Sequence, residues 1–246
     1  MLFIDIETLP PLGWDDAKID AYVRERVPGT FKKPESIAQW CEENRTEVFA
    51  RAALDWRVSR IACIGVIYDD GETVMEDCFM GGTTDAHEAQ ALRNLDDFLS
   101  AAAAHDGAVC GHNVLGFDLP RLHITSARVG SSLTSWLAQL SRHSRSRVVD
   151  TMHLAFPTRE RVGLADLGEA LGIGGKSGHG SEVLAMYTEG RHGELMRYCL
   201  DDVRLTREVY RRLSGEMPAY APAVHPLNMD RSQVAALIDN AMRRDA

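Results

Sequence analysis

The sequence begins with a segment, Leu2–Thr8, whose apolar residues are interrupted by two carboxylates, Asp5 and Glu7. The apolar pattern predicts a buried strand, which Pro10-Pro11 brings to an end. Because side chains alternate between the two faces of a strand, Asp5 and Glu7 lie on the same face. Two such carboxylates repel each other and lose hydration unless a cation lies between them. The segment contains no Lys or Arg, so a divalent metal ion is the natural cation. The alternative is that one carboxylate caps the turn and the other reaches solvent.

The rest of the chain predicts an α/β protein with a mixed sheet. Apolar runs predict further strands at Arg60–Tyr68, Glu72–Phe79, Ala108–Gly111 and Arg147–Thr151. Helical spacing predicts helices at Asp15–Arg26, Glu35–Leu54, Thr84–Ala104, about Pro120–Val129, Leu164–Leu171, Ser181–Tyr187, Gly193–Leu213 and Ser232–Arg244. Between Val129 and Arg147 we expect a polar, serine-rich connection. We therefore expect one layered domain over residues 1–214, with a helical insertion at about 11–56, followed by a connector and a helix at 215–246.

The net charge of −9 argues against tight, sequence-independent binding of duplexes, which depends on Lys and Arg neutralising phosphates. It does not exclude a nucleic-acid enzyme, because the ions at a metal site offset the charge of its acidic ligands. We expect no membrane partner, since no apolar run approaches the roughly 20 residues that cross a bilayer. The five cysteines are scattered singly and the first strand leaves no room for a signal peptide, so we expect a cytoplasmic protein with reduced thiols.

Two later motifs carry further acidic residues. Asn113-x3-Phe117-Asp118 falls where a helix is expected to start, although Asp118 just before Pro120 also fits a plain helix N-cap. Tyr198-x3-Asp202 lies on a late helix, where a spacing of four puts both side chains on one face. A phenol beside an acid suits a metal ligand with a neighbour that positions water, but a solvent-facing pair of acids, Asp201 and Asp202, is an equal alternative for this helix alone.

The three motifs, in this order, resemble those of the DEDDy-type 3′–5′ exonucleases of the DnaQ-like, ribonuclease H-like superfamily. The chain is most similar to stand-alone exonucleases related to the proofreading domain of family-B DNA polymerases, over roughly Leu2 to Leu213. The histidine-containing branch fits less well, since Arg197 stands where it requires a histidine. The resemblance implies a ribonuclease H-like mixed five-stranded sheet flanked by helices, with the helical insertion after the first strand.

The resemblance also implies a catalytic set, which consists of Asp5, Glu7, Asp118, Tyr198 and Asp202. In this family the four carboxylates hold two Mg²⁺ or Mn²⁺ ions. Asp5 would bridge both ions, Glu7 and Asp202 would complete one site, and Asp118 would hold the other. Tyr198 would orient the attacking hydroxide.

Six further residues are candidates for substrate binding: Ile6, Thr8, His112, Asn113, Phe117 and Lys176. Asn113 would contact the terminal nucleotide, with a structural turn as the alternative for both His112 and Asn113. Phe117 would stack on a base, or serve as a core aromatic beside a helix start. Lys176, in a glycine-rich loop, would touch phosphate.

We therefore expect a metal-dependent 3′–5′ exonuclease that acts on single-stranded or frayed DNA and releases 5′-mononucleotides. The alternatives are an exoribonuclease of the same mechanism, a binding module without turnover, and a proofreading subunit. A polymerase or repair factor would then be a partner in trans, since no polymerase-sized region occurs in the 246 residues. With an aromatic content of 7%, we expect short-range contacts of weak sequence preference rather than an extended stacking surface.

Overall fold

The computed structural model describes residues 1–157, 161–175 and 180–215. The chain divides into two compact units, Met1–Leu213 and Ser214–Ala246, and all elements named below belong to the first. The helix expected at Ser232–Arg244 lies outside the described residues. No helix in the described ranges is both long and apolar enough to cross a membrane.

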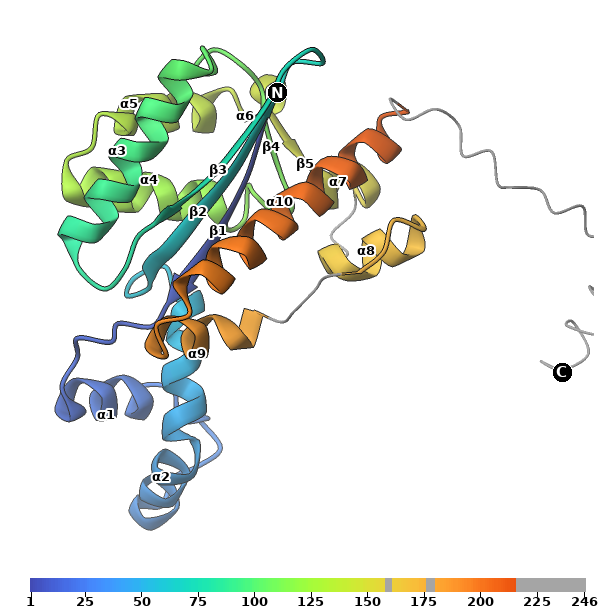
Figure 1. Cartoon of the computed structure of the whole chain (residues 1–246). Coiled ribbons are helices and arrows are strands. Elements are labelled where there is room, and N and C mark those ends of the chain that lie inside the picture. Colours follow the sequence, from blue (N-terminus) through green and yellow to red (C-terminus); the bar gives the residue numbers. More distant parts are fainter. Residues whose placement is uncertain (158–160, 176–179, 216–246) are drawn as a thin grey trace, which may run out of the picture. The chain divides into compact units, whose positions relative to one another are not determined.

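The core of the first unit is a five-stranded sheet of order β3-β2-β1-β4-β5 (Figure 1). The strands are β1 (Leu2–Leu9), β2 (Arg60–Asp69), β3 (Val74–Met80), β4 (Val109–Gly111) and β5 (Val148–Asp150). The pairs β1–β2 and β2–β3 are antiparallel, whereas β1–β4 and β4–β5 are parallel. The predicted mixed five-stranded sheet is therefore confirmed.

Helices cover both faces of this sheet. The helices of the described residues are α1 (Asp16–Arg24), α2 (Pro34–Arg51), α3 (Asp85–Ala101), α4 (Asp118–Val129), α5 (Leu133–Arg142), α6 (Ser144–Arg147), α7 (Thr151–Ala155), α8 (Leu164–Ala170), α9 (Val183–Thr188) and α10 (His192–Leu213), with short 3₁₀ turns η1 (Ala52–Leu54) and η2 (Gly180–Glu182). In Figure 1, α3, α4 and α5 lie on one face, and α10 lies along the other. The predicted helical insertion is present as α1, α2 and η1 between β1 and β2.

The alternation along β1 divides its side chains between two cores. Leu2, Ile4 and Ile6 belong to the large core under α3, α4 and α5. Phe3 packs on the other face with Val203 of α10. Since side chains two apart share a face, the odd-numbered positions of β1 point toward α10, and the two carboxylates of the strand are among them.

A glycine allows α10 to approach the sheet closely at this point. Gly65 of β2 pairs with Asp5 of β1, and a Cβ placed on Gly65 would lie 2.8 Å from Cys199 Sγ and 3.1 Å from Val203 Cγ2. Real Cβ atoms essentially never come that close to a neighbour, so any side chain here would push α10 away. The missing side chain therefore sets the distance between α10 and Asp5.

Two local expectations were wrong, and one short helix was not predicted. The segment after Val129 is not a serine-rich connection but holds helix α5, whose buried residues are Leu133, Trp136, Leu137 and Leu140. Their spacing of three and four is that of an amphipathic helix. Helix α4 begins at Asp118 rather than near Pro120, with Phe117 at the N-cap position, so Asp118 is not a plain N-cap. The short helix α7, which directly follows β5, was not predicted from the sequence.

We expect Gly65→Ala to lower the free energy of unfolding by about 1–3 kcal/mol, the usual cost of overpacking. Gly193→Ala is the matched control, because Gly193 lies on α10 with nothing within 4 Å of its Cβ position. That control should not lower stability, because alanine is the better helix former and its Cβ meets nothing there. Urea unfolding of both variants measures the difference. A Gly65→Ala protein as stable as the wild type would show that α10 does not depend on this contact.

Candidate active site

Three carboxylates from β1 and α10 converge on one point. Asp5, Glu7 and Asp202 each offer an oxygen, and the three oxygens lie within 4.8 Å of one another. Asp202 is buried, and Asp5 and Glu7 are half-buried. Carboxylate oxygens are the ligands that Mg²⁺ and Mn²⁺ prefer, and a bound cation would relieve the repulsion of three such groups at this separation. The donor set therefore fits a hard divalent ion.

The structure distinguishes the two adjacent acids of α10. The Asp201 side chain is 44% exposed and forms an ion pair with Arg204, with Nη1 and Oδ1 2.7 Å apart. Asp202 is 2% exposed and belongs to the carboxylate group. The two side chains point in different directions because successive residues of a helix are about 100° apart.

Tyr198 lies one helical turn before Asp202, on the same face. It is 6% exposed and hydrogen-bonds to Asp202. Burial, followed by the charges of Asp202, Glu7 and Asp5, raises the pKa of this phenol well above its usual value. Tyr198 therefore stays protonated at neutral pH. Its O–H donates to Asp202, and its oxygen can accept a hydrogen bond from a ligand.

Asp118 is attached to the same strand, β1. Its Oδ1 accepts a hydrogen bond of 2.9 Å from the backbone N–H of Ile6, the residue between the two carboxylates of β1. Burial raises the pKa of Asp118 to about 7, although the hydrogen bond from Ile6 acts in the opposite direction. The proposed fourth ligand is thus attached to the strand that carries Asp5 and Glu7, but it is not among the oxygens that lie within 4.8 Å of one another.

A cavity of ≈ 520 Å³ opens beside Glu7. Its lining includes Glu7 and Thr8 of β1, Arg51 and Leu54 of the insertion, Phe117 before α4, and Val183 of α9. Two of the six predicted substrate-binding residues, Thr8 and Phe117, therefore line this cavity. Thr8 also donates a hydrogen bond of 2.7 Å from Oγ1 to the carbonyl of Ala53, which attaches the insertion to β1.

His112 and Asn113 form a turn that holds the loop before α4. Nδ1 of His112 lies 2.9 Å from Thr151 Oγ1, and Nε2 lies 2.8 Å from the carbonyl oxygen of Val162. Asn113 has a φ of 57°, a left-handed conformation that asparagine tolerates better than most residues. Its backbone N–H donates to Asp150 Oδ1 at 2.8 Å. These contacts favour the structural alternative for both residues.

The other two predicted contacts differ in outcome. Ile6 contributes through its backbone, since its side chain is buried in the large core and its N–H holds Asp118. Lys176 lies outside the described residues.

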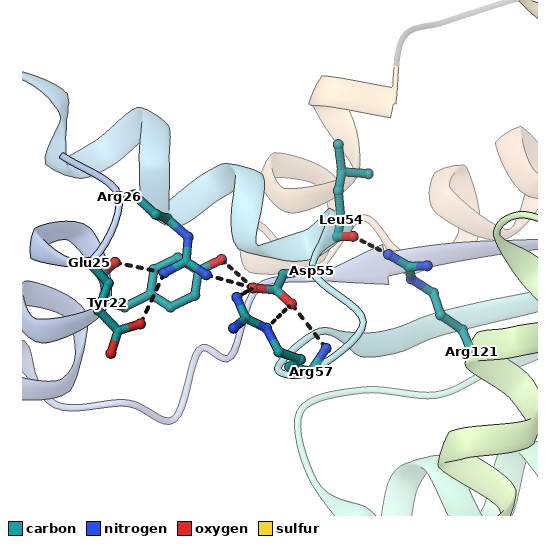
Figure 2. Close-up of polar contacts among 7 residues, drawn as sticks. All are labelled: Tyr22, Glu25, Arg26, Leu54, Asp55, Arg57 and Arg121. Atoms are coloured by element: carbon teal, nitrogen blue, oxygen red, sulfur yellow. Dashed lines mark hydrogen bonds and ion pairs between the residues drawn. The ribbon is translucent and has the colours of Figure 1, made fainter. Parts of the chain in front are cut away.

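Arg121 is a site residue that the sequence did not predict. Its guanidinium carbon lies 3.8 Å from the centroid of the Phe117 ring. Its Nη2 donates a hydrogen bond to the carbonyl of Leu54, which connects α4 to the end of the insertion (Figure 2). Arg121 is only 7% exposed. The spacing of four from Phe117 was the available signal, since it places the two side chains on one helical face.

A second group of possible metal ligands lies beneath Asp5. The sulfurs of Cys63, Cys78 and Cys199 are buried within 4.8 Å of one another, and Cys199 Sγ lies 3.8 Å from Asp5 Oδ2. Thiolates prefer softer ions than Mg²⁺. The hard-ion site is therefore the carboxylate group.

Residues 51–219 match a family model described as "Predicted 3'-5' exonuclease related to the exonuclease domain of PolB". The chain belongs to this family. The matched segment includes Asp118, Tyr198 and Asp202, and it begins after the first strand. Exonucleases of this family typically depend on metal ions, and their substrates are nucleic acids.

The fold of this exonuclease family member also resembles a solved structure, the family B DNA polymerase from the hyperthermophilic archaeon Pyrobaculum calidifontis. The match has a TM-score of 0.52 and 20% sequence identity, and it covers 87% of this chain and 24% of the polymerase chain. The exonuclease thus spans about a quarter of the polymerase that it matches. The expected ribonuclease H-like fold is confirmed. Among curated proteins the chain has no match.

The raised pKa of Asp118 predicts how stability depends on pH without metal ions. The folded carboxyl has a pKa of about 7, whereas an unfolded aspartate has one of about 3.9. Between these values the folded protein holds a proton that the unfolded chain releases. The contribution of Asp118 to stability is therefore complete below about pH 4 and is lost as the pH rises to about 7, with a limiting slope of about 1.4 kcal/mol per pH unit.

Urea unfolding in EDTA across this range measures the effect, with Asp118→Asn as the comparison. The difference between the two proteins isolates Asp118 from the other titrating groups. Parallel pH profiles of the wild type and the variant would contradict the raised pKa.

Proposed function

We propose that the chain is a metal-dependent exonuclease that removes 5′-mononucleotides from the 3′ ends of single-stranded or frayed DNA. The observation that carries the proposal is the carboxylate group of Asp5, Glu7 and Asp202 beside a cavity. Tyr198 adjoins the same space, since its hydroxyl lies 4.0 Å from the Cβ position of Gly180, which lines the cavity. Ligands for ions and space for a nucleotide therefore meet at one place.

Asp5, Glu7 and Asp202, together with Asp118, would hold two Mg²⁺ or Mn²⁺ ions. When bound, such ions lower the pKa of a water molecule and stabilise charge on the attacking and leaving oxygens of the phosphodiester. The protein supplies the positions of the ligands. Asp118 is held by the Ile6 N–H, and Asp202 by the attachment of α10 to the sheet.

Tyr198 would orient the attacking water. Its raised pKa keeps the phenol protonated, so it acts as a hydrogen-bonding group rather than as a base. Its contact with Asp202 fixes the ring at the carboxylate group. The terminal nucleotide would occupy the cavity, where Phe117 offers an aromatic ring for stacking.

DNA is preferred over RNA in this proposal because the solved structure with a similar fold is a DNA polymerase. An exoribonuclease of the same mechanism is the second candidate, because a contact to the 2′-hydroxyl is what distinguishes the two sugars. A proofreading role with a polymerase in trans is compatible with a DNA or an RNA substrate.

All five cysteines are thiols rather than disulfides, which supports a cytoplasmic setting.

The deciding experiment uses 5′-labelled single strands of DNA and RNA of one sequence, with Mg²⁺, Mn²⁺ or EDTA. We expect a ladder that shortens from the 3′ end of DNA with either ion and is absent with EDTA and in Asp202→Ala. Asp201→Ala is the matched control and should retain the ladder, since Asp201 faces solvent and pairs with Arg204. Shortening of RNA alone would favour the exoribonuclease, and binding without cleavage would favour a binding module.

Tyr198→Phe should slow cleavage by about 10²–10⁴-fold, the usual contribution of a positioned proton-handling group. The ring and its packing remain, so the variant should bind Mg²⁺ with wild-type affinity. Single-turnover cleavage and calorimetric titration measure the two quantities. An unchanged rate would remove Tyr198 from the mechanism.

A further inference from the structure

The turn that joins the insertion to β2 presents two exposed apolar side chains. Leu54 is 64% exposed and Trp56 is 58% exposed. Within the ranges that the structure describes, no other large apolar residue is as exposed as either of them. One residue, Asp55, separates them. Exposed apolar groups of this size mark a binding surface more often when they occur together than when they are scattered.

Polar contacts hold Asp55, the residue between the exposed pair, as Figure 2 shows. The Asp55 carboxylate accepts hydrogen bonds from Tyr22 Oη at 3.1 Å, from Arg26 Nη2 at 2.7 Å, and from Arg57 Nε and Nη2 at 2.9 and 2.7 Å. The Arg57 guanidinium and these other donors hold the pKa of Asp55 well below its usual range. The carboxylate therefore remains charged at neutral pH, where its hydrogen bonds to Arg26 and Arg57 are ion pairs.

The carbonyl preceding Asp55 is held as well. Arg121 donates to Leu54 O while its guanidinium lies over the Phe117 ring. The turn that carries Leu54 and Trp56 is thus attached on one side to Tyr22 of α1 and to Arg26 just after it. On the other side it is attached to the first turns of α4 through Arg121. A preorganised surface of this kind loses little conformational entropy when it binds a ligand.

The two exposed residues lie on the borders of two hollows. Leu54 lines the cavity beside Glu7 and Phe117. Trp56 lines a second hollow of ≈ 210 Å³, whose other walls include Arg57, Arg60 and Arg128. The turn therefore stands between the candidate active site and an adjoining hollow with an indole ring and three guanidinium groups.

Indole and guanidinium groups together suit an unpaired nucleotide. Bases stack on aromatic rings without sequence preference, and arginine binds both phosphates and ring faces. The three guanidinium groups already have acidic partners: Arg57 pairs with Asp55, and Arg60 and Arg128 pair with Asp85 and Glu88. Stacking, rather than net charge, would therefore supply most of the binding.

We propose that this turn is a stacking platform for an unpaired nucleotide on the 5′ side of the 3′-terminal nucleotide. Trp56 stacks on the base, and Leu54 forms the wall between that base and the catalytic cavity. This inference rests on the proposed nuclease function and extends it, because it adds a base-binding position on the 5′ side of the terminal nucleotide and makes an unpaired strand the preferred substrate.

The test is a scan of abasic positions. Single-stranded DNA ten-mers with a 5′ fluorescein carry one abasic residue at each position from the 3′ end, and KM and kcat are measured with Mg²⁺. In the wild type, an abasic residue at one position near the 3′ end should raise KM by about 5- to 150-fold, the range for loss of one stacked base. Trp56→Ala should raise KM for the intact ten-mer by the same factor and should show no further loss at that position.

Two variants complete the design. Trp56→Phe should restore most of the affinity, because it restores a ring. Val74→Ala is the matched control, since Val74 is also exposed (52%) but lies at the opposite end of β2 and β3. Because the guanidinium groups are already paired, the effect of Trp56→Ala should be the same at low and high salt.

The outcomes separate the two proposals. If the wild type cleaves the ten-mer and Trp56→Ala behaves like Val74→Ala, the platform is wrong and the nuclease function stands. That result would leave a protein partner as the occupant of the exposed turn. If the wild type neither binds nor shortens the ten-mer, both the platform and the proposed function are wrong.

Discussion

The close contact between α10 and the sheet is the constraint on which the site depends. The carboxylates of Asp5 and Glu7 come from a strand, and that of Asp202 comes from a helix whose sequence is almost two hundred residues away. Their oxygens meet within 4.8 Å because Gly65 leaves no side chain between β2 and α10. Three like charges at this distance oppose folding. The apolar contacts of α10 with the sheet, such as Val203 with Phe3, must outweigh this repulsion in the protein without metal ions.

The position of Asp118 shows how the backbone completes the site. Its carboxyl is fully buried and has a raised pKa, so removing it from water is costly unless it gains a partner. The N–H of Ile6 is that partner, and the same strand segment carries Asp5 and Glu7. One strand therefore presents two carboxylates through its side chains and holds a third through its backbone.

The insertion contributes to the site from outside the sheet. It is attached to β1 through Thr8 and Ala53, and to α4 through Leu54 and Arg121. These attachments make it one wall of the cavity that contains Glu7. Since loops on a rigid scaffold carry specificity in many enzymes, the insertion is where we expect the substrate preference of this exonuclease to be decided.

The sequence by itself determined the local geometry of the site. The period of two in the first strand predicted that Asp5 and Glu7 share a face, and a spacing of four predicted that Tyr198 and Asp202 do. The order of the three motifs indicated the family and its five-stranded sheet, both of which are confirmed. These properties follow from the backbone repeat of a single element, so residues close in sequence are enough to predict them.

Only the tertiary structure decided the rest. The choice between Asp201 and Asp202 depends on which face of α10 meets the sheet. The contact that favours a structural role for His112 joins it to Val162, fifty residues further along the chain. The stacking of Arg121 on Phe117 could have been predicted from their spacing of four, but the hydrogen bond from Arg121 to the Leu54 carbonyl could not. Contacts of this kind join elements that are far apart in the sequence, and the packing of the whole domain decides which of them meet. The periodicity of a single segment therefore cannot predict them.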